Sequence, residues 1–247
     1  MKAYFLVLAP VLAICADQTP VQRLFDGKLT VSQRATACFE LRGSREPDVV
    51  NAMAKALEDP ALLACAADNL RIAGAVDTLK LALSNPDSQV RAAAVRQLGT
   101  FQKPELLDVI SRVAQDENLL VATNALAGLN EYHDPVVIPY LASLAKRGGM
   151  IGDMALDRLS QLESSTALGI ARGLLASSQV PDRLYAMRVI GAFGDASDLA
   201  ELTKIARSTP ENLSQRNRGF GFMPAINLAR AAQSAMASIQ SRQQEAQ

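Results

Sequence analysis

The chain has 247 residues, of which 49% are hydrophobic and 20% charged, a globular composition long enough for one or two domains. It contains no tryptophan and few aromatic residues, so its core is expected to consist of small and medium aliphatic side chains, which favours packed helices over a β-sandwich. The 25 basic residues balance the 25 acidic residues, and this lack of a basic excess argues against a nucleic-acid partner.

The N-terminal residues 1–16 have the features of an export signal. Lys2 precedes an uncharged apolar run at residues 3–14, which is too short to span a bilayer but matches the hydrophobic region of a signal peptide. A buried N-terminal helix is the alternative. The stretch LAIC resembles a bacterial lipobox, in which Cys15 would be acylated, with Ile14 in place of the expected small residue. We therefore expect an extracytoplasmic protein, periplasmic or secreted, whose only membrane attachment would be a lipid at Cys15.

A period of about thirty residues follows along most of the chain. Six segments share an Ala-x-x-x-Leu/Ile pattern, and their first residues, the anchor alanines, are Ala37, Ala66, Ala94, Ala125, Ala155 and Ala186. Apolar residues at spacings of three to four follow the anchors, so each period is predicted to hold a first helix (helix A) and a second helix (helix B). Because a two-helix unit cannot bury its own apolar face, successive units are expected to stack.

Prolines and glycines mark the expected ends of helices A. Asp59-Pro60 and Asn85-Pro86 are predicted to open helices A, because a capping side chain precedes a proline at the first helical position. Gly43, Gly99 and Gly191 are predicted to end such helices. Each lies just after the leucine or isoleucine that follows its anchor alanine by four positions, and glycine at a helix C-terminus can adopt a positive φ.

The stretch DSQVRAAAVRQLG at residues 87–99 resembles the first helix of a HEAT repeat, and the period is closest to the short HEAT-like repeats of phycobilisome lyases. The resemblance covers about residues 30–208 and is weakest at GGMIGDMALDRL, residues 148–159, which lacks the usual Val-Arg pair. It implies an all-α fold, an α-solenoid or superhelix of stacked two-helix HEAT-like repeats with helices B on the concave side. Proteins of this kind are usually non-catalytic scaffolds or adaptors.

The resemblance also implies a ladder of ion pairs between repeats. Arg34, Arg91 and Arg183 each lie three residues before their anchor alanine. In the family the equivalent arginine commonly pairs with an acidic residue at the preceding turn, and Asp87 and Asp182 are the candidate partners here. Contact of these arginines with a ligand is the alternative interpretation.

Basic residues recur at similar places on the expected helices B and form the candidate protein-binding surface. These residues are Lys55, Arg112, Lys146, Arg147, Arg172 and Lys204. If helices B face inward, they would form a basic stripe that recognises an acidic peptide or polyanion. The alternative is a solvated face with cations near helix C-termini, where the helix dipole favours them.

Cys38 and Cys65 lie beside the anchors of adjacent helices A, so a disulfide between them is geometrically conceivable in an oxidising compartment. Two buried thiols are the alternative. His133 is the only histidine and is interpreted as a turn residue. Without a phosphate-binding loop, dinucleotide fingerprint, nucleophile elbow or zinc-ligand cluster, we assign no catalytic, cofactor-binding or metal-binding residue and expect no cofactor.

The predicted organisation has five parts. They are a signal peptide at 1–16, an N-terminal linker or cap at 17–31, about six HEAT-like repeats at 32–208, a loop at 209–224, and a C-terminal capping helix and tail at 225–247. Phe220 and Phe222 in the loop are candidate partner contacts, and the alternative is that they fold back to cover the last repeat. Residues 241–247 are expected to fray.

The expected function is a non-catalytic HEAT-repeat scaffold or adaptor that binds a protein or peptide partner outside the cytoplasm. One alternative is an enzyme-assisting or lyase-like protein, by analogy with the phycobilisome lyases. The other is a lipid-anchored structural protein of the envelope.

Overall fold

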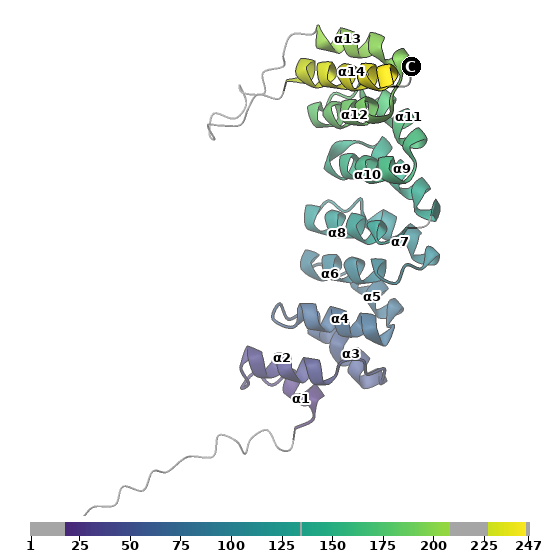
Figure 1. Cartoon of the computed structure of the whole chain (residues 1–247). Helices are drawn as coiled ribbons and strands as arrows, with labels where there is room; N and C mark the ends of the chain where they lie inside the picture. The colour runs from purple at the N-terminus through teal and green to yellow at the C-terminus, as the bar shows by residue number, and fades with distance from the viewer. Residues whose placement is uncertain (1–17, 134, 208–226, 246–247) are drawn as a thin grey trace, which may run out of the picture. The chain divides into compact units, whose positions relative to one another are not determined.

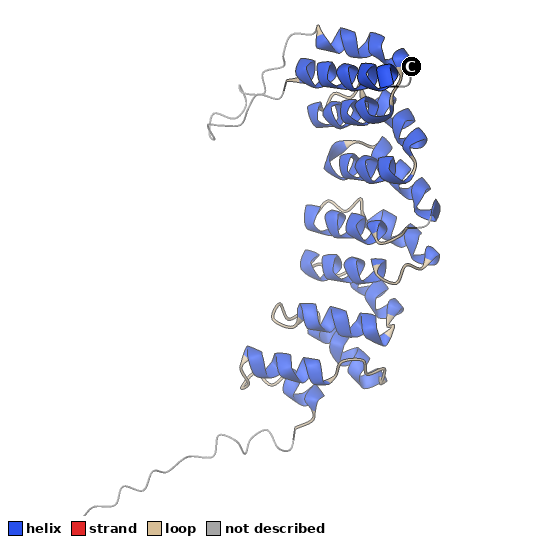
Figure 2. Ribbon diagram, in the orientation of Figure 1, coloured by secondary structure: helices blue, strands red, loops and turns tan. Residues whose placement is uncertain are grey.

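The computed structural model describes residues 18–133, 135–207 and 227–245, and all regular elements in these residues are helices (Figure 2). The expected signal peptide with Cys15, and the loop at 209–224 with Phe220 and Phe222, lie outside the described residues. The chain divides into two compact units, unit 1 up to Phe101 and unit 2 from Gln102 onward. In the part of the chain that the structure describes, none of the helices has both the length and the apolar character needed to cross a bilayer.

Unit 1 contains alternating helices A and B. After the short helix α1 (Pro20–Leu24), helices A are α2 (Val31–Glu40), α4 (Leu63–Ala73) and α6 (Ser88–Gly99), and helices B are α3 (Pro47–Ala56) and α5 (Val76–Ala82). Helix α4 packs between α2 and α6, and α3 packs on α5. Helices A therefore form one layer of this unit and helices B the other (Figure 1).

Unit 2 also alternates helices A and B, beginning with a helix B. Its helices A are α8 (Leu119–Asn130), α10 (Gly149–Leu162) and α12 (Val180–Phe193), and its helices B are α7 (Leu107–Val113), α9 (Ile138–Lys146), α11 (Ser164–Leu174) and α13 (Leu199–Ala206). Short 3-10 helices η1 (Pro104–Leu106), η2 (Pro135–Val137) and η3 (Ala196–Asp198) precede α7, α9 and α13. Successive helices A contact one another, as do α7, α9 and α11.

The anchor alanines form the seams between neighbouring helices A. All six are 0% exposed, as are the residues four positions later except Leu41, which is 9% exposed. A small anchor lets helix axes approach to about 8–10 Å, and the larger residue one turn later fills the space beside it. The period predicted from the sequence is confirmed, and each unit is the predicted all-α solenoid of stacked helix pairs.

The predicted starts of two helices A are wrong by two to three residues. Helix α6 begins at Ser88, with Asp87 as the capping residue that accepts a hydrogen bond from the Gln89 amide at 2.8 Å. Asn85 instead accepts a bond from the Asp87 amide at 2.8 Å, which forms a turn before the helix. Asp59 likewise accepts from the Ala61 amide at 2.9 Å in a turn, and α4 starts only at Leu63.

The three predicted helix-ending glycines differ in the structure. Gly43 follows α2 with a φ of +81°, as predicted. Gly99 is the last residue of α6, as predicted, but without a positive φ. Gly191 lies inside α12, which continues to Phe193. A Cβ atom at position 191 would lie 3.1 Å from the Cα atom of Ala235. Gly191 therefore serves the close approach of another helix rather than the end of its own.

That other helix is α14 (Leu228–Glu245), which packs on α12 and α13 and takes the place of a further helix A. Its buried face consists of Leu228, Ala232, Ala235 and Ile239. The prediction that the chain frays from residue 241 is wrong for residues 241–245. Arg242 donates hydrogen bonds to the carbonyl oxygens of Gly191 and, at 2.8 Å, Gly194, so it satisfies acceptors at the end of α12.

The repeat that begins with α10 resembles the HEAT pattern least, and close packing accounts for its different sequence. At the position of the usual arginine, α10 carries Gly152, where a Cβ atom would lie 2.9 Å from the carbonyl oxygen of Leu144 in α9. Glycine at this position allows the backbones of α9 and α10 to touch. The repeat is therefore intact as a helix pair, although its sequence departs from the family pattern.

Candidate functional site

Three of the basic residues predicted on helices B make contacts of modest strength. Lys55 on α3 places its Nζ atom 4.9 Å from the centre of the Phe25 ring, a cation–π contact. Arg112 on α7 donates from Nε to the carbonyl oxygen of Asp108 at 3.3 Å. Lys204 on α13 lies 3.5 Å from a carboxylate oxygen of Glu201, and its side chain is 78% exposed. Exposed contacts of this kind contribute little to stability.

Arg147 and Arg172 link successive repeats of unit 2. Arg147 donates to the side-chain oxygen of Gln115, which lies one repeat earlier. Arg172 on α11 donates from Nε and Nη2 to the two carboxylate oxygens of Asp198, at 2.7 and 3.0 Å, and also reaches Asp195 at 3.3 Å. The hydrogen bonds from Arg172 lower the pKa of Asp198 below its usual range. Arg172 therefore ties α11 to the turn between α12 and α13 in the next repeat.

The arginines of the expected ladder have different partners. Arg34 forms an ion pair with Asp59, which lies in the turn before the next helix A, and its hydrogen bond lowers the pKa of Asp59. Arg91 donates to the backbone carbonyl oxygens of Asn85 and Pro86, at 2.9 and 3.0 Å. Asp87, its expected partner, caps α6 as described above. Arg34 thus pairs forward along the chain, and Arg91 contacts the turn before its own helix.

Asp182, the other expected ladder acid, binds the preceding repeat and its own turn. Its carboxylate accepts hydrogen bonds from the Gly149 amide at 2.8 Å and from the Ser177 hydroxyl at 2.6 Å, and the residue is only 4% exposed. Arg183 follows it on the first turn of α12 and is half-buried. Asp182 thereby fixes the turn between α9 and α10 against α12.

A second buried acid, Asp153 on α10, was not singled out by the sequence. It is 2% exposed, and its Oδ1 atom has no hydrogen-bond partner among the described residues. Burial, followed by the negative charge of Asp182, raises the pKa of Asp153 to about 6, while Arg188 acts in the opposite direction. Burial of two carboxylates near one another is a source of pH dependence in this part of unit 2.

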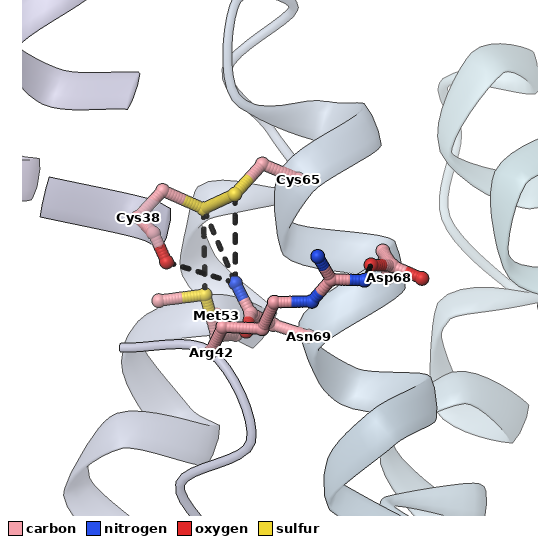
Figure 3. The surroundings of a disulfide bond; sticks show 6 residues. All are labelled: Cys38, Arg42, Met53, Cys65, Asp68 and Asn69. Atoms are coloured by element: carbon pink, nitrogen blue, oxygen red, sulfur yellow. Dashed lines mark hydrogen bonds and ion pairs between the residues drawn. A yellow bond between two sulfur atoms is a disulfide. The ribbon is translucent and has the colours of Figure 1, made fainter. Parts of the chain in front are cut away.

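Cys38 on α2 and Cys65 on α4 form a disulfide with a Cα–Cα distance of 6.4 Å (Figure 3). The side-chain amide of Asn69, 4% exposed, donates to the carbonyl oxygen of Cys38 at 3.0 Å and points toward both sulfur atoms. Beside the disulfide, Arg42 and Asp68 form an ion pair at 3.0 Å. Two successive helices A of unit 1 are therefore joined covalently.

His133 lies exposed in the turn after α8, with Nδ1 3.4 Å from the guanidinium of Arg158. Across residues 18–133, 135–207 and 227–245, no group of three or more histidine, cysteine or acidic side chains is placed to hold a metal ion.

Lys146 borders a groove between α9 and α11, two successive helices B of unit 2. The groove has a volume of about 540 Å³ and is lined by Lys146, Thr166, Gly169, Ile170, Gly173 and Leu174. Ile170 and Leu174, 8% and 9% exposed, form its floor. At Gly169 and Gly173 an added Cβ atom would meet nothing within 4 Å. We call this site the α9–α11 groove.

Sequence reasoning identified one of the six groove residues, Lys146, through its place at the end of a helix B. The two glycines were missed because a glycine pair in a helical segment reads as weak helix propensity rather than as a surface. Their spacing of four residues is the signal that could have placed them on one helix face.

One family model matches part of the chain, and several solved structures are similar to it. Residues 76–149 match the family model described as HEAT repeats, while the comparison with curated proteins gives no significant match. Among solved structures, human deoxyhypusine hydroxylase in complex with glycerol is 18% identical, with 90% of this chain and 95% of that chain covered and a TM-score of 0.36. An engineered protein is 18% identical over 90% of this chain and 95% of that chain, with a TM-score of 0.32.

A designed armadillo repeat protein is 15% identical over 90% of this chain and 100% of that chain, with a TM-score of 0.33. Residues 76–149 are therefore similar to HEAT repeats, and the described residues form an all-α fold of stacked helix pairs.

Proposed function

We propose that this protein is a non-catalytic HEAT-repeat scaffold that binds another protein through the α9–α11 groove, outside the cytoplasm. The observation that carries the proposal is the groove itself, which runs between two stacked helices B. Its floor is apolar and the main chain of α11 is open to a partner at two positions. A surface of this kind suits a peptide segment, because the peptide can cover apolar side chains while its polar groups stay accessible to water or to the rim.

The location outside the cytoplasm draws support from two independent features. The Cys38–Cys65 disulfide is a type of bond that persists in oxidising compartments and is rare in the cytosol. The apolar run at residues 3–14 has the length of the hydrophobic region of a secretory signal.

Site-specific photo-crosslinking in cells that make the full chain tests the binding surface. One variant carries a photoreactive side chain at Thr166 in the groove, and the control carries it at Met154, which is 41% exposed on α10 in the layer of helices A. We expect a defined protein adduct from position 166 in the extracytoplasmic fraction and none from position 154. Equal adducts from both positions, or no adduct from either, would contradict the proposal.

The compartment is tested on the same material. N-terminal sequencing and mass measurement of the mature protein are expected to show loss of the first 14 to 16 residues, with a lipid on Cys15 if the lipobox is used. A mature chain that retains Met1, with Cys38 and Cys65 free to react with alkylating reagents in intact cells, would place the protein in the cytoplasm.

A further inference from the structure

The glycine pair of α11 has no explanation within the protein's own packing. Gly169 and Gly173 are four residues apart and therefore share one face of the helix. Two other helical glycines are required by close contacts, Gly152 by the Leu144 carbonyl and Gly191 by Ala235. At Gly169 and Gly173 a methyl group would instead enter open space.

Glycine inside a helix lowers stability relative to alanine, because it loses more backbone entropy on folding. Two such glycines in a helix of 11 residues, both exposed, therefore work against the fold of the free protein. Glycine on an exposed face has one use that alanine lacks, which is to let a second main chain come into contact with the helix backbone. The floor on either side of this strip, Ile170 and Leu174, supplies apolar contacts for that chain.

The charge of the groove indicates what that chain carries. Lys146 is the only charged residue among the six that line the groove, and the structure gives it no acidic partner among the described residues. The cation nearest along α11, Arg172, is held by Asp198. Glu163 at the start of α11 is occupied in capping, because its carboxylate accepts bonds from the Ser165 hydroxyl and the Thr166 amide. The lining therefore has a net positive charge and one lysine to receive a carboxylate.

We infer that the α9–α11 groove takes an extended, acidic segment of a partner protein, with its main chain against Gly169 and Gly173 and a carboxylate at Lys146. This inference rests on the proposed protein-binding function and specifies its partner. A peptide fits better than a nucleic acid, because a polyanion is bound by many cations along its backbone, whereas this groove offers one cation beside an apolar floor.

The test uses random peptides displayed on phage and selected on the full chain. Selected peptides are synthesised with a fluorophore, and their affinities are measured by fluorescence anisotropy for the wild type, G169A/G173A, K146Q and the control K204Q. Lys204 is a matched control because it is an exposed lysine on another helix B, outside the groove. Oligothymidylate serves as a polyanion without amino-acid side chains.

We expect the selected peptides to be enriched in aspartate or glutamate. Their affinity should fall by about tenfold or more in G169A/G173A, and by a similar factor in K146Q because one charged contact is lost. The affinity of K204Q should stay within about twofold of the wild type. The Tm of G169A/G173A should equal or exceed that of the wild type, because alanine favours the helix. That combination of a stable fold and lost binding is not produced by a structural role for the glycines.

The outcomes separate this inference from the function on which it rests. The selected peptides could lack acidic enrichment and lose affinity in G169A/G173A but not in K146Q. That result would overturn the inference of an acidic partner and leave the groove as a binding site. Affinities unchanged in both variants overturn the inference and the proposed binding surface together. A lowered Tm of G169A/G173A, or oligothymidylate binding as tight as that of the peptides, also overturns the inference.

Discussion

Replacement of Asp153 by asparagine should change the pH dependence of stability in a direction that the structure fixes. Asp153 lies on α10 with 2% exposure, and its folded-state pKa is raised to about 6 by burial and by the charge of Asp182. In the unfolded chain the carboxyl returns to its ordinary pKa of 3.8. The folded state therefore holds the proton more tightly, so the contribution of this group is fully present below about pH 4 and is lost as the pH rises through 6.

Because of this pKa difference, the free energy of unfolding of the wild type should fall by at most about 3 kcal/mol between pH 4 and pH 8 through this group. D153N has no proton to lose at this position and keeps nearly the same shape. The difference in unfolding free energy between D153N and the wild type should therefore shift in favour of D153N as the pH rises, by up to that amount. Urea denaturation at a series of pH values, followed by hydrogen exchange of the amides of α10, measures this difference.

Asp59 supplies a control of opposite sign, because its pKa is lowered by Arg34. Its contribution is present above its unfolded pKa and lost as the pH falls through the lower folded value. D59N should therefore be destabilising at neutral pH, and this effect should disappear in acid. A difference between D153N and the wild type that stays constant, or that shrinks with rising pH, would refute the reasoning about the buried acid pair.

Three further predictions concern links between repeats. Reduction of the Cys38–Cys65 disulfide, whose cysteines are 27 positions apart, should cost about 3.5 kcal/mol by the loop-entropy relation, seen as faster hydrogen exchange in α2 and α4 but not in α12. R172A should lower the stability of unit 2 by about 1–2 kcal/mol, with only partial rescue by R172K, because the partly exposed Arg172 holds both oxygens of buried Asp198. R242A should destabilise the docking of α14 by about 1–2 kcal/mol, because two carbonyl groups at the end of α12 lose their hydrogen-bond donor. Amide hydrogen exchange should become faster in α14 and stay unchanged in α8.

The fold could be predicted from the sequence because its determinant is local and repeated. An alanine followed four positions later by leucine or isoleucine recurs in six helices A, and all six anchor alanines are fully buried. Helix starts were less predictable, because one side chain can either cap a helix or close a turn before it. In unit 1, Asn85 closes a turn and Asp87, two residues later, caps α6 by the same kind of bond.

The site was less accessible to prediction, because its contacts join residues far apart in the chain. Asp198 lies 26 positions after Arg172, and no spacing rule distinguishes it from the neighbouring acids as the bidentate partner. Gly191 faces Ala235 on α14, which follows α13 in the chain, so its role in packing has no local signal. The α9–α11 groove is lined in part by Gly169 and Gly173, which have no side chain. A search of the sequence for chemically active residues does not select glycines.

The disulfide between α2 and α4 also has a mechanical consequence. A tensile force applied along the chain from its N-terminus would unravel the first helices, but the covalent bridge would carry the load directly from Cys38 to Cys65. The 27 residue steps between them, a contour length of about 90 Å, would stay shielded from extension until the bond is reduced. A tether at the N-terminal end would therefore lengthen in two stages, with the second one controlled by the redox conditions around the protein.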